Sequence, residues 1–148
     1  MAGKHARAMS KWLMKTEPST YSFDDLVREG STHWNGVRNY AARLHLSAMK
    51  VGDQCFIYHS MGPKELVGIA EVTRTAYPDP CEGEDEPADR WVMVDIKPVR
   101  ALKSPVTLAT VKAHALLSKM ELVRQSRLSV CPVKPDEWKT VLALADGK

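Results

Sequence analysis

The chain has 148 residues, of which 44% are hydrophobic and 26% are charged. These proportions predict one folded domain with a sizeable core and exclude an intrinsically disordered chain. The formal net charge of +3, from 21 basic and 18 acidic residues, is too small to establish nucleic-acid binding but is compatible with a local basic surface.

The N-terminal part of the chain predicts a leader, a strand and a helix. Residues 1–10 lack the apolar core of a signal peptide and are expected to form a flexible leader, which leaves residues 11–148 as a single domain. Residues 11–16 alternate weakly in polarity before a proline, as a short strand does. Ser22 is placed to cap a helix that Gly30 ends.

The next segment, residues 34–43 with the sequence WNGVRNYAAR, combines a turn with a helix start. Asn-Gly tolerates positive φ, so the chain can bend sharply after Trp34. Asn39 is a good N-cap for a helix that runs to about residue 49. The face of that helix that we expect to be apolar contains Ala41, Leu44 and Ala48.

This segment also suits a nucleotide. Arg38 and Arg43 would lie beside the positive end of the helix, where free N–H groups attract phosphate. An indole such as Trp34 can stack on a base while the arginines bind the backbone. The alternative is that Trp34 is a core residue and that the two arginines are simply solvated.

The middle of the chain predicts three strands in succession. Residues 54–60 form the first, and residues 66 to about 77 return after a hairpin loop. Gly68, inside the returning strand, indicates a bulge or a close approach of backbone. Residues 78–89 are rich in proline and acidic groups and predict a polar loop. Residues 90–102 then carry the longest strand pattern.

The C-terminal part predicts two helices with a strand between them. Pro105 precedes a helix that ends near Leu117, residues 122–130 alternate like a strand, and Pro135 begins a final helix. Strands linked by hairpins favour an antiparallel or mixed sheet over a doubly wound parallel one. The predicted fold class is therefore α+β, with a mainly antiparallel β-barrel flanked by helices.

The three cysteines and the apolar residues indicate the setting. Cys55, Cys81 and Cys131 are widely spaced and form no CxxC pair, which argues against a metal site and a disulfide framework. A reducing compartment fits this pattern, so we expect a cytoplasmic protein, or a nuclear one in a eukaryote. No apolar run approaches membrane-spanning length, so no membrane partner is expected.

Enzyme motifs are missing from the sequence. There is no GxxxxGK[ST], GxGxxG, GxSxG or HExxH pattern. Cys55 and His59 would share a strand face but lie roughly 13 Å apart, too far for a catalytic pair. We therefore expect no catalytic residue and no cofactor. Two alternatives stay open: an enzyme acting on a nucleotide with His59 or Asp95 as acid or base, and a protein–protein module at the sheet edge near Pro98.

Two further groups are ambiguous from spacing alone. Tyr58, His59 and Ser60 end a strand, where they can read a small planar ligand at a barrel mouth. They are also compatible with a core tyrosine and a capped hairpin. Arg127 and Ser129 share a face of the last predicted strand, where they offer a cation and a hydroxyl group or form a plain exposed edge.

Several segments together resemble the EVE domain family over about residues 11 to 145. The resemblance includes the thymocyte nuclear protein family and its bacterial homologues. It implies a PUA-like fold, a curved barrel with flanking helices, as in the YTH and SRA readers of modified bases. The segments are 12–18, 34–43, 56–60, 68–70, 76–79, 91–96 and 124–130.

The same resemblance implies a non-catalytic module that binds a flipped, modified base in DNA or RNA. Examples are 5-methylcytosine, 5-hydroxymethylcytosine and methylated RNA bases; the oligomeric state expected is a monomer. The implied base pocket, with Trp34 and Trp91 as facing walls, comprises Trp34, Asn35, Tyr58, His59, Ser60, Trp91 and Ser129. The implied phosphate-binding residues are Arg38, Arg43, Arg127 and, at the mouth, Lys15.

Overall fold

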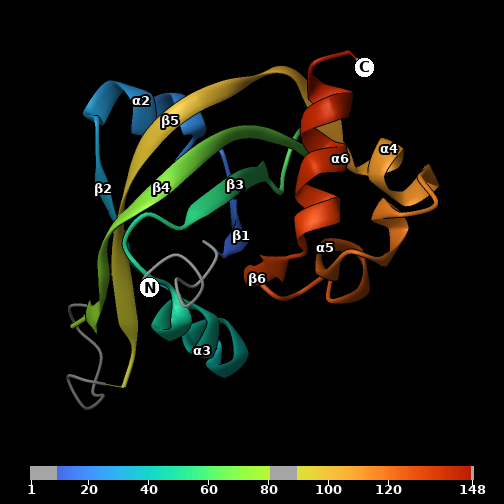
Figure 1. The fold of residues 1–148 in the computed structure, drawn as a ribbon. Coiled ribbons are helices and arrows are strands. Elements are labelled where there is room, and N and C mark those ends of the chain that lie inside the picture. The colour runs from blue at the N-terminus through green and yellow to red at the C-terminus, as the bar shows by residue number, and fades with distance from the viewer. Residues whose placement is uncertain (1–9, 81–89, 148) are drawn as a thin grey trace, which may run out of the picture.

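The computed structural model describes residues 10–80 and 90–147 (Figure 1). Most of the expected leader and most of the acidic loop lie outside this part of the chain. The strands are β1 (Lys11–Thr16), β2 (Thr32–Trp34), β3 (Gln54–His59), β4 (Glu65–Pro78), β5 (Val92–Thr107) and β6 (Val130–Val133). The helices are α2 (Phe23–Glu29), α3 (Tyr40–Ala48), α4 (Leu108–Ala113), the 3-10 turn η1 (Leu117–Lys119), α5 (Glu121–Arg124) and α6 (Pro135–Ala145).

The strands form one six-stranded sheet in the order β2-β5-β4-β3-β1-β6. All neighbours are antiparallel except β1 and β3, which run parallel. The long strands β4 and β5 curve strongly across the molecule (Figure 1), and their pairing shifts register at several points. Such irregularities bend a sheet. The α+β class is confirmed, but β2 and β6 are not paired with each other among the described residues, so the expected closed barrel is not confirmed.

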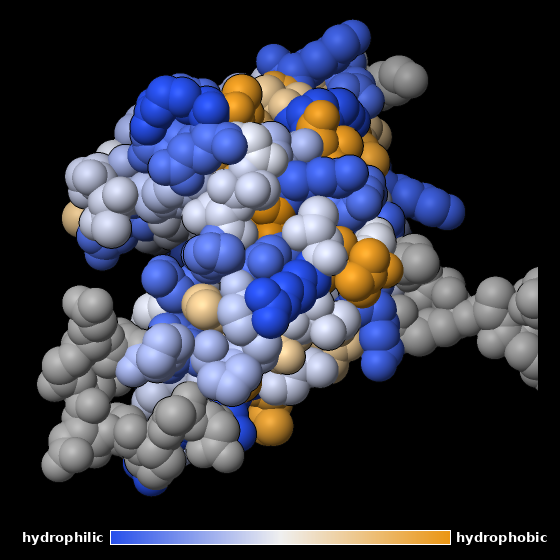
Figure 2. Space-filling model, turned by 90° about the vertical axis from the view of Figure 1, so that its left-hand side faces the viewer, coloured by the Kyte–Doolittle hydropathy of each residue, from blue (hydrophilic) through white to orange (hydrophobic). Residues whose placement is uncertain are grey.

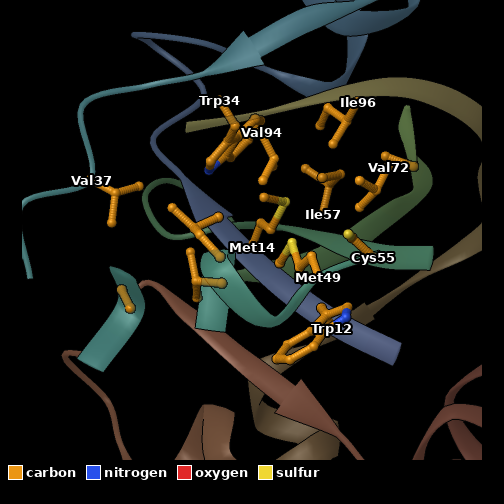
Figure 3. Packing of buried hydrophobic residues seen from close by; sticks show 14 of the residues in the cluster. Trp12, Met14, Trp34, Val37, Met49, Cys55, Ile57, Val72, Val94 and Ile96 are labelled. Carbon is orange, nitrogen blue, oxygen red and sulfur yellow. The ribbon is translucent and has the colours of Figure 1, made fainter. Parts of the chain in front are cut away.

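Side-chain alternation along β1 divides the interior into two cores. Trp12 and Met14 point to one face of the sheet and Leu13 points to the other. The first core lies under α2 and α3, and Figure 3 shows ten of its labelled members around β1. The second lies under α4, α5 and α6, where the Trp138 ring stacks on Phe56 at 3.9 Å between centroids.

Helix α3 begins after Asn39 as predicted, but it buries a different face. The Asn39 side chain accepts a hydrogen bond from the N–H of Ala42, which confirms the cap. The residues that α3 and its C-cap bury are Ala42, Leu46 and Met49, whereas Leu44 is 67% exposed. The expected face of Ala41, Leu44 and Ala48 was therefore wrong, because α3 turns a different face to the core.

The strand predicted over residues 122–130 was also wrong. Residues 121–124 form the short helix α5, a turn follows in which the N–H of Leu128 donates to the carbonyl of Gln125, and β6 begins only at Val130. Of residues 127–130, only Val130 therefore lies in a strand. Likewise Pro105 lies inside β5 rather than before a helix, and the helical stretch after it breaks into α4 and η1.

Gly68 is a point of close approach, as its position in a strand predicted. A Cβ atom added there would lie 2.4 Å from the ring of Phe23, the first residue of α2. The register of β4 against β5 also shifts between Leu66 and Gly68. The missing side chain of Gly68 therefore lets α2 pack directly on the sheet, close to the region described next.

Candidate functional site

A cavity of about 370 Å³ opens beside the edge strand β2. Its volume lies within the roughly 300–1,000 Å³ range of small-ligand sites. Four segments form its walls: the end of β1, the turn before α2, β2 with the loop after it, and the residue before β6. The lining residues are Lys15, Thr16, Thr20, Tyr21, Thr32, His33, Trp34, Asn35, Gly36, Val37, Arg38 and Ser129.

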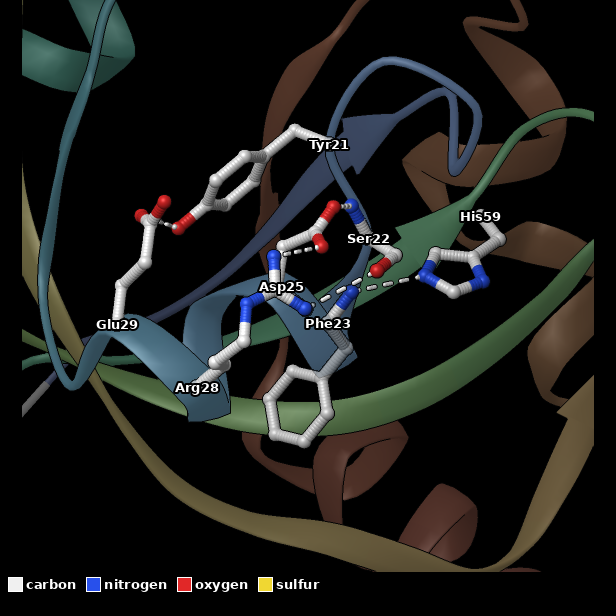
Figure 4. A network of polar contacts seen from close by, with 7 residues as sticks. All are labelled: Tyr21, Ser22, Phe23, Asp25, Arg28, Glu29 and His59. Carbon is white, nitrogen blue, oxygen red and sulfur yellow. Dashed lines mark hydrogen bonds and ion pairs between the residues drawn. The ribbon is translucent and has the colours of Figure 1, made fainter.

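Two aromatic side chains meet at the cavity. Trp34 is only 8% exposed, because most of its indole packs in the first core (Figure 3). The Tyr21 ring approaches it edge-on, with 6.2 Å between centroids. The Tyr21 hydroxyl donates to a Glu29 carboxylate oxygen at 2.7 Å (Figure 4), and burial raises the pKa of that hydroxyl. Trp34 is thus a core residue that also contributes a wall of the cavity.

Hydroxyl groups supply much of the polar lining. Thr16 donates through Oγ1 to the carbonyl of Tyr21 at 2.7 Å, which fixes the turn before α2. Beside Thr16, the carbonyl of Ser129 accepts from the N–H of Lys15. The lining also includes Thr20 and Thr32. These threonines carried no recognisable sequence signal, because the fold brings Thr20 from a turn and Thr32 from β2 to one cavity.

A buried carboxylate holds the loop after β2 in place. Asp79 Oδ2 accepts from the N–H of Gly36 at 2.8 Å and from Arg38 Nη1 at 3.1 Å. Gly36 has φ 80°, which only glycine adopts readily, as the Asn-Gly pattern predicted. The Asp79 side chain is 4% exposed and that of Arg38 is 23% exposed. Arg38 therefore lines the cavity as part of an internal ion pair, not as the open phosphate contact expected from the sequence.

Trp91 does not line the cavity. Its ring lies 5.0 Å from the ring of Tyr40 at the start of α3 and 5.6 Å from the guanidinium carbon of Arg38. It is buried, and its ring packs against the guanidinium of the Asp79–Arg38 pair. The expected second aromatic wall is therefore not formed by Trp91, and Tyr21 is the aromatic residue that the structure places beside Trp34 instead.

The Tyr58-His59-Ser60 group does not line the cavity either. Tyr58 is buried in the second core, on the other face of the sheet, and burial raises its pKa. His59 Nε2 accepts from the N–H of Phe23 at 3.1 Å and so supports the start of α2 (Figure 4); burial lowers its pKa. Ser60 donates through Oγ to the carbonyl of Thr16 at 3.3 Å. The structure thus gives these residues packing and capping roles, the alternative that spacing had left open.

The remaining expected cations lie in different places. Lys15 borders the cavity, and its Nζ donates to the carbonyls of Ser126 at 2.9 Å and Gln125 at 3.5 Å. Burial lowers the pKa of Lys15. Arg43 lies on α3 outside the cavity, and its Nε is buried with no hydrogen-bond partner among the described residues. Arg127 lines a neighbouring hollow.

A polar cluster at β2 includes Asp95, one of the residues considered as an acid or base. His33 and Asp95 lie directly opposite each other on β2 and β5, with 2.8 Å between Nδ1 and Oδ1. Tyr77 bonds both residues and its hydroxyl donates to Asp95. Burial and the bond to Asp95 raise the pKa of Tyr77 to about 12. Burial raises the pKa of Asp95, but the bonds from Tyr77 and His33 outweigh it and the net shift is downward.

The surface around the cavity is mostly polar. Figure 2 shows the face that carries α2 and β2, where hydrophobic residues form separate patches among hydrophilic ones. Within residues 10–80 and 90–147, no group of three or more His, Cys, Asp or Glu side chains is placed to hold a metal ion. No helix in the same part of the chain has both the length and the apolar character needed to cross a membrane.

Comparison with known proteins gives a consistent result. The family model described as EVE domain matches residues 10–144. Human thymocyte nuclear protein 1 is 34% identical over 169 residues, covering 93% of this chain and 74% of that protein. The structure of Rpa0253 from Rhodopseudomonas palustris is 48% identical with a TM-score of 0.86, covering 93% and 94% of the two chains. The human THYN1 protein in complex with 5-methylcytosine-containing DNA is 32% identical with a TM-score of 0.86, covering 94% and 99%.

Proposed function

The chain belongs to the EVE domain family, and from this we propose that it is a non-catalytic module that binds modified DNA. The modified base enters the cavity beside Trp34. The THYN1 relative, which shares the fold at a TM-score of 0.86, was solved with DNA that contains 5-methylcytosine. We therefore take 5-methylcytosine as the first base to test. The single observation from this chain that supports the proposal is the open cavity, walled by Trp34 and Tyr21 and edged by hydroxyl groups.

The energetics of such binding set the requirements on the cavity. Flipping a base out of a duplex costs a few kcal/mol. Aromatic stacking returns roughly 1–3 kcal/mol, and a buried methyl group adds roughly 0.8 kcal/mol. Trp34 exposes 8% of its surface, about 20 Å² of a side chain of roughly 250 Å². One indole therefore cannot supply the whole stacking term, and the Tyr21 ring must share it.

Polar groups of the lining read the edge of the base in this proposal. Asn35 is exposed at the loop after β2, and its amide offers both a donor and an acceptor. Ser129, on the other side of the cavity, offers a hydroxyl. A base that leaves such groups unpaired is disfavoured more strongly than one that merely lacks a methyl group. Discrimination between bases therefore depends on Asn35 and Ser129 more than on the aromatic pair.

Phosphate binding falls to the cations that the structure leaves near the surface. Lys15 lies at the rim of the cavity, and Arg127 lies in the adjoining hollow. Arg38 acts differently: its pair with Asp79 holds the loop that carries Asn35 and Gly36. We therefore expect substitution of Lys15 to change the salt dependence of binding, and substitution of Arg38 to change the shape of the cavity.

The test is a fluorescence-anisotropy titration with two short DNA duplexes that differ in one central cytosine, methylated or not. Thr20→Tyr places a large side chain in the cavity from an exposed turn position, so it should abolish the preference for the methylated duplex. Ser19→Tyr adds the same side chain at the exposed neighbouring position outside the lining and should leave the preference unchanged. Equal preference in the wild type and in Thr20→Tyr would reject the cavity as the base site.

A second variant addresses the indole without emptying the core. Trp34→Phe keeps an aromatic ring in the first core but shortens the wall of the cavity. We expect weaker binding of the methylated duplex, with the thermal midpoint recorded in parallel to separate binding from folding. If a folded Trp34→Phe protein binds the methylated duplex with unchanged affinity, Trp34 does not contact the base. The Thr20→Tyr variant would still test the cavity itself.

A further inference from the structure

A second hollow lies next to the cavity and is larger, about 550 Å³. Helix α3 contributes one wall through Ala41 and His45, with its cap Asn39. The other wall is the segment from α5 through the following turn, together with Pro132 of β6. We call this hollow the α3–α5 groove. It is open, and seven of its ten lining residues are polar or charged, unlike those of the apolar grooves that accept a partner helix.

The α3–α5 groove adjoins the cavity at two places along the chain. Arg38 lines the cavity and the next residue, Asn39, lines the groove. Leu128 lines the groove and the next residue, Ser129, lines the cavity. Consecutive residues lie about 3.8 Å apart between Cα atoms. The two hollows therefore share a rim at both places, as sites for neighbouring nucleotides of one strand must.

The charges of the groove favour an anion. Its lining holds two arginines and one acid. Arg124 Nη1 lies 4.0 Å from Glu121 Oε1, whereas Arg127 forms no ion pair within the described part of the chain. Lys15 stands between the hollows, bonded to the carbonyls of the turn that carries Arg127. Burial lowers the pKa of His45, so its imidazole adds a neutral hydrogen-bonding group rather than another cation.

From this continuity and charge we propose that the α3–α5 groove holds the nucleotide that flanks the modified base on the same strand, with Arg127 on its phosphate. This rests on the proposed function and extends it: the binding unit is at least two consecutive nucleotides, one in the cavity and one in the groove. Arg124, already close to Glu121, contributes less than Arg127. A free modified nucleoside occupies the cavity and leaves the groove empty.

The test compares three ligands by calorimetry: 5-methyl-2′-deoxycytidine, its 5′-monophosphate, and a single-stranded tetranucleotide that contains it. Arg127→Gln should weaken the tetranucleotide roughly two- to fivefold, the range expected for one exposed charge contact. It should lower the slope of log K against log salt by about 0.7, the value for one phosphate of a single strand. Affinity for the nucleoside should stay at the wild-type value.

Two further variants make the test specific. Gln125→Glu adds a negative charge at an exposed groove position with little change in shape, and it should weaken the tetranucleotide but not the nucleoside. Arg100→Gln removes an exposed arginine of β5 that lines neither hollow, and it should change neither affinity. The thermal midpoint of each variant establishes that it is folded.

The possible results separate this inference from the proposed function. If Arg127→Gln and Gln125→Glu leave the affinity for the tetranucleotide unchanged, the groove assignment is overturned. Binding of the nucleoside would in that case still support the cavity. If both variants lose affinity for the tetranucleotide but the protein shows no preference for the modified base, the groove is supported and the base site is rejected. Displacement of the tetranucleotide by a glutamate-rich peptide at equal concentration overturns the proposal in favour of an acidic protein partner.

Discussion

Replacing Asp79 with asparagine should both destabilise the protein and weaken the proposed binding of modified DNA. Asp79 is the buried acceptor that joins the N–H of Gly36 to the guanidinium of Arg38. Asparagine has nearly the same shape and keeps one acceptor oxygen, but it removes the negative charge. The loop from residue 35 to residue 38, which lines the cavity, then loses its main anchor.

The magnitude follows from the burial of the pair. Removing one partner of a buried ion pair typically costs about 3–5 kcal/mol. Arg38 retains some solvent contact and asparagine keeps a neutral hydrogen bond, so we expect the lower end, about 3 kcal/mol. With a urea m-value of about 2 kcal/mol/M, the unfolding midpoint should fall by about 1.5 M.

The assay is equilibrium urea unfolding followed by tryptophan fluorescence, within a double-mutant cycle. Arg38→Met removes the cation but keeps a long apolar side chain against Trp91. If the pair is the cause, Asp79→Asn should cost much less in the Arg38→Met background than in the wild type. A cost below about 1 kcal/mol in the wild type, or equal costs in both backgrounds, would refute the reasoning.

Further predictions address the packing and the titratable groups. Gly68→Ala should cost about 1–3 kcal/mol, because its Cβ would lie 2.4 Å from the Phe23 ring, and a double variant with Phe23→Leu should lose less than the sum of the singles. The folded state raises the pKa of Tyr77 to about 12, so this residue stabilises the fold fully below its unfolded-state pKa of about 10. That stabilisation is lost as the pH rises from about 10 to about 12, and Tyr77→Phe should therefore flatten the plot of unfolding free energy against pH in this range. The hydrogen bond from Tyr77 also lowers the pKa of Asp95 in the folded state. Asp95 therefore stabilises the fold above its unfolded-state pKa, and this stabilisation is lost as the pH falls through its folded-state pKa. The Tyr77→Phe protein should accordingly lose less stability than the wild type below about pH 4. Burial raises the pKa of the Cys131 thiol to about 12. In a variant with Cys131 as its single cysteine, this thiol should therefore be alkylated at pH 8 no faster than the whole protein unfolds. Rapid alkylation of the native protein would contradict the packing.

The placement of Arg38 changes how its substitution should be interpreted. A loss of DNA affinity in an Arg38 variant would be read from the sequence as a lost phosphate contact. The structure predicts a different signature, because the guanidinium bonds Asp79 inside the fold. We expect a lower affinity with an unchanged salt slope for Arg38→Met, whereas Arg127→Gln should lower the slope. The salt dependence therefore distinguishes a positioning residue from a phosphate contact.

Local signals in the sequence determined much of the framework. Ser22 and Asn39 cap helices because a side-chain oxygen and a free N–H lie only three residues apart along the chain. The alternation of β1 and the proline that begins α6 have equally local causes. The motifs from Trp34 to Arg43 carried the family resemblance, which the comparisons confirmed.

Only the tertiary structure decided which residues share a site. Asp79 meets Gly36 across 43 positions of sequence, and β2 pairs with β5 so that His33 faces Asp95 across 62. Such meetings depend on the register of the sheet, and a slip of one residue would turn each side chain to the other face. The same rule places Tyr58 in the second core, on the face of the sheet opposite to the core that holds Trp34. Sequence patterns fix the period of a strand, but the neighbours that a strand acquires fix which of its side chains meet a ligand.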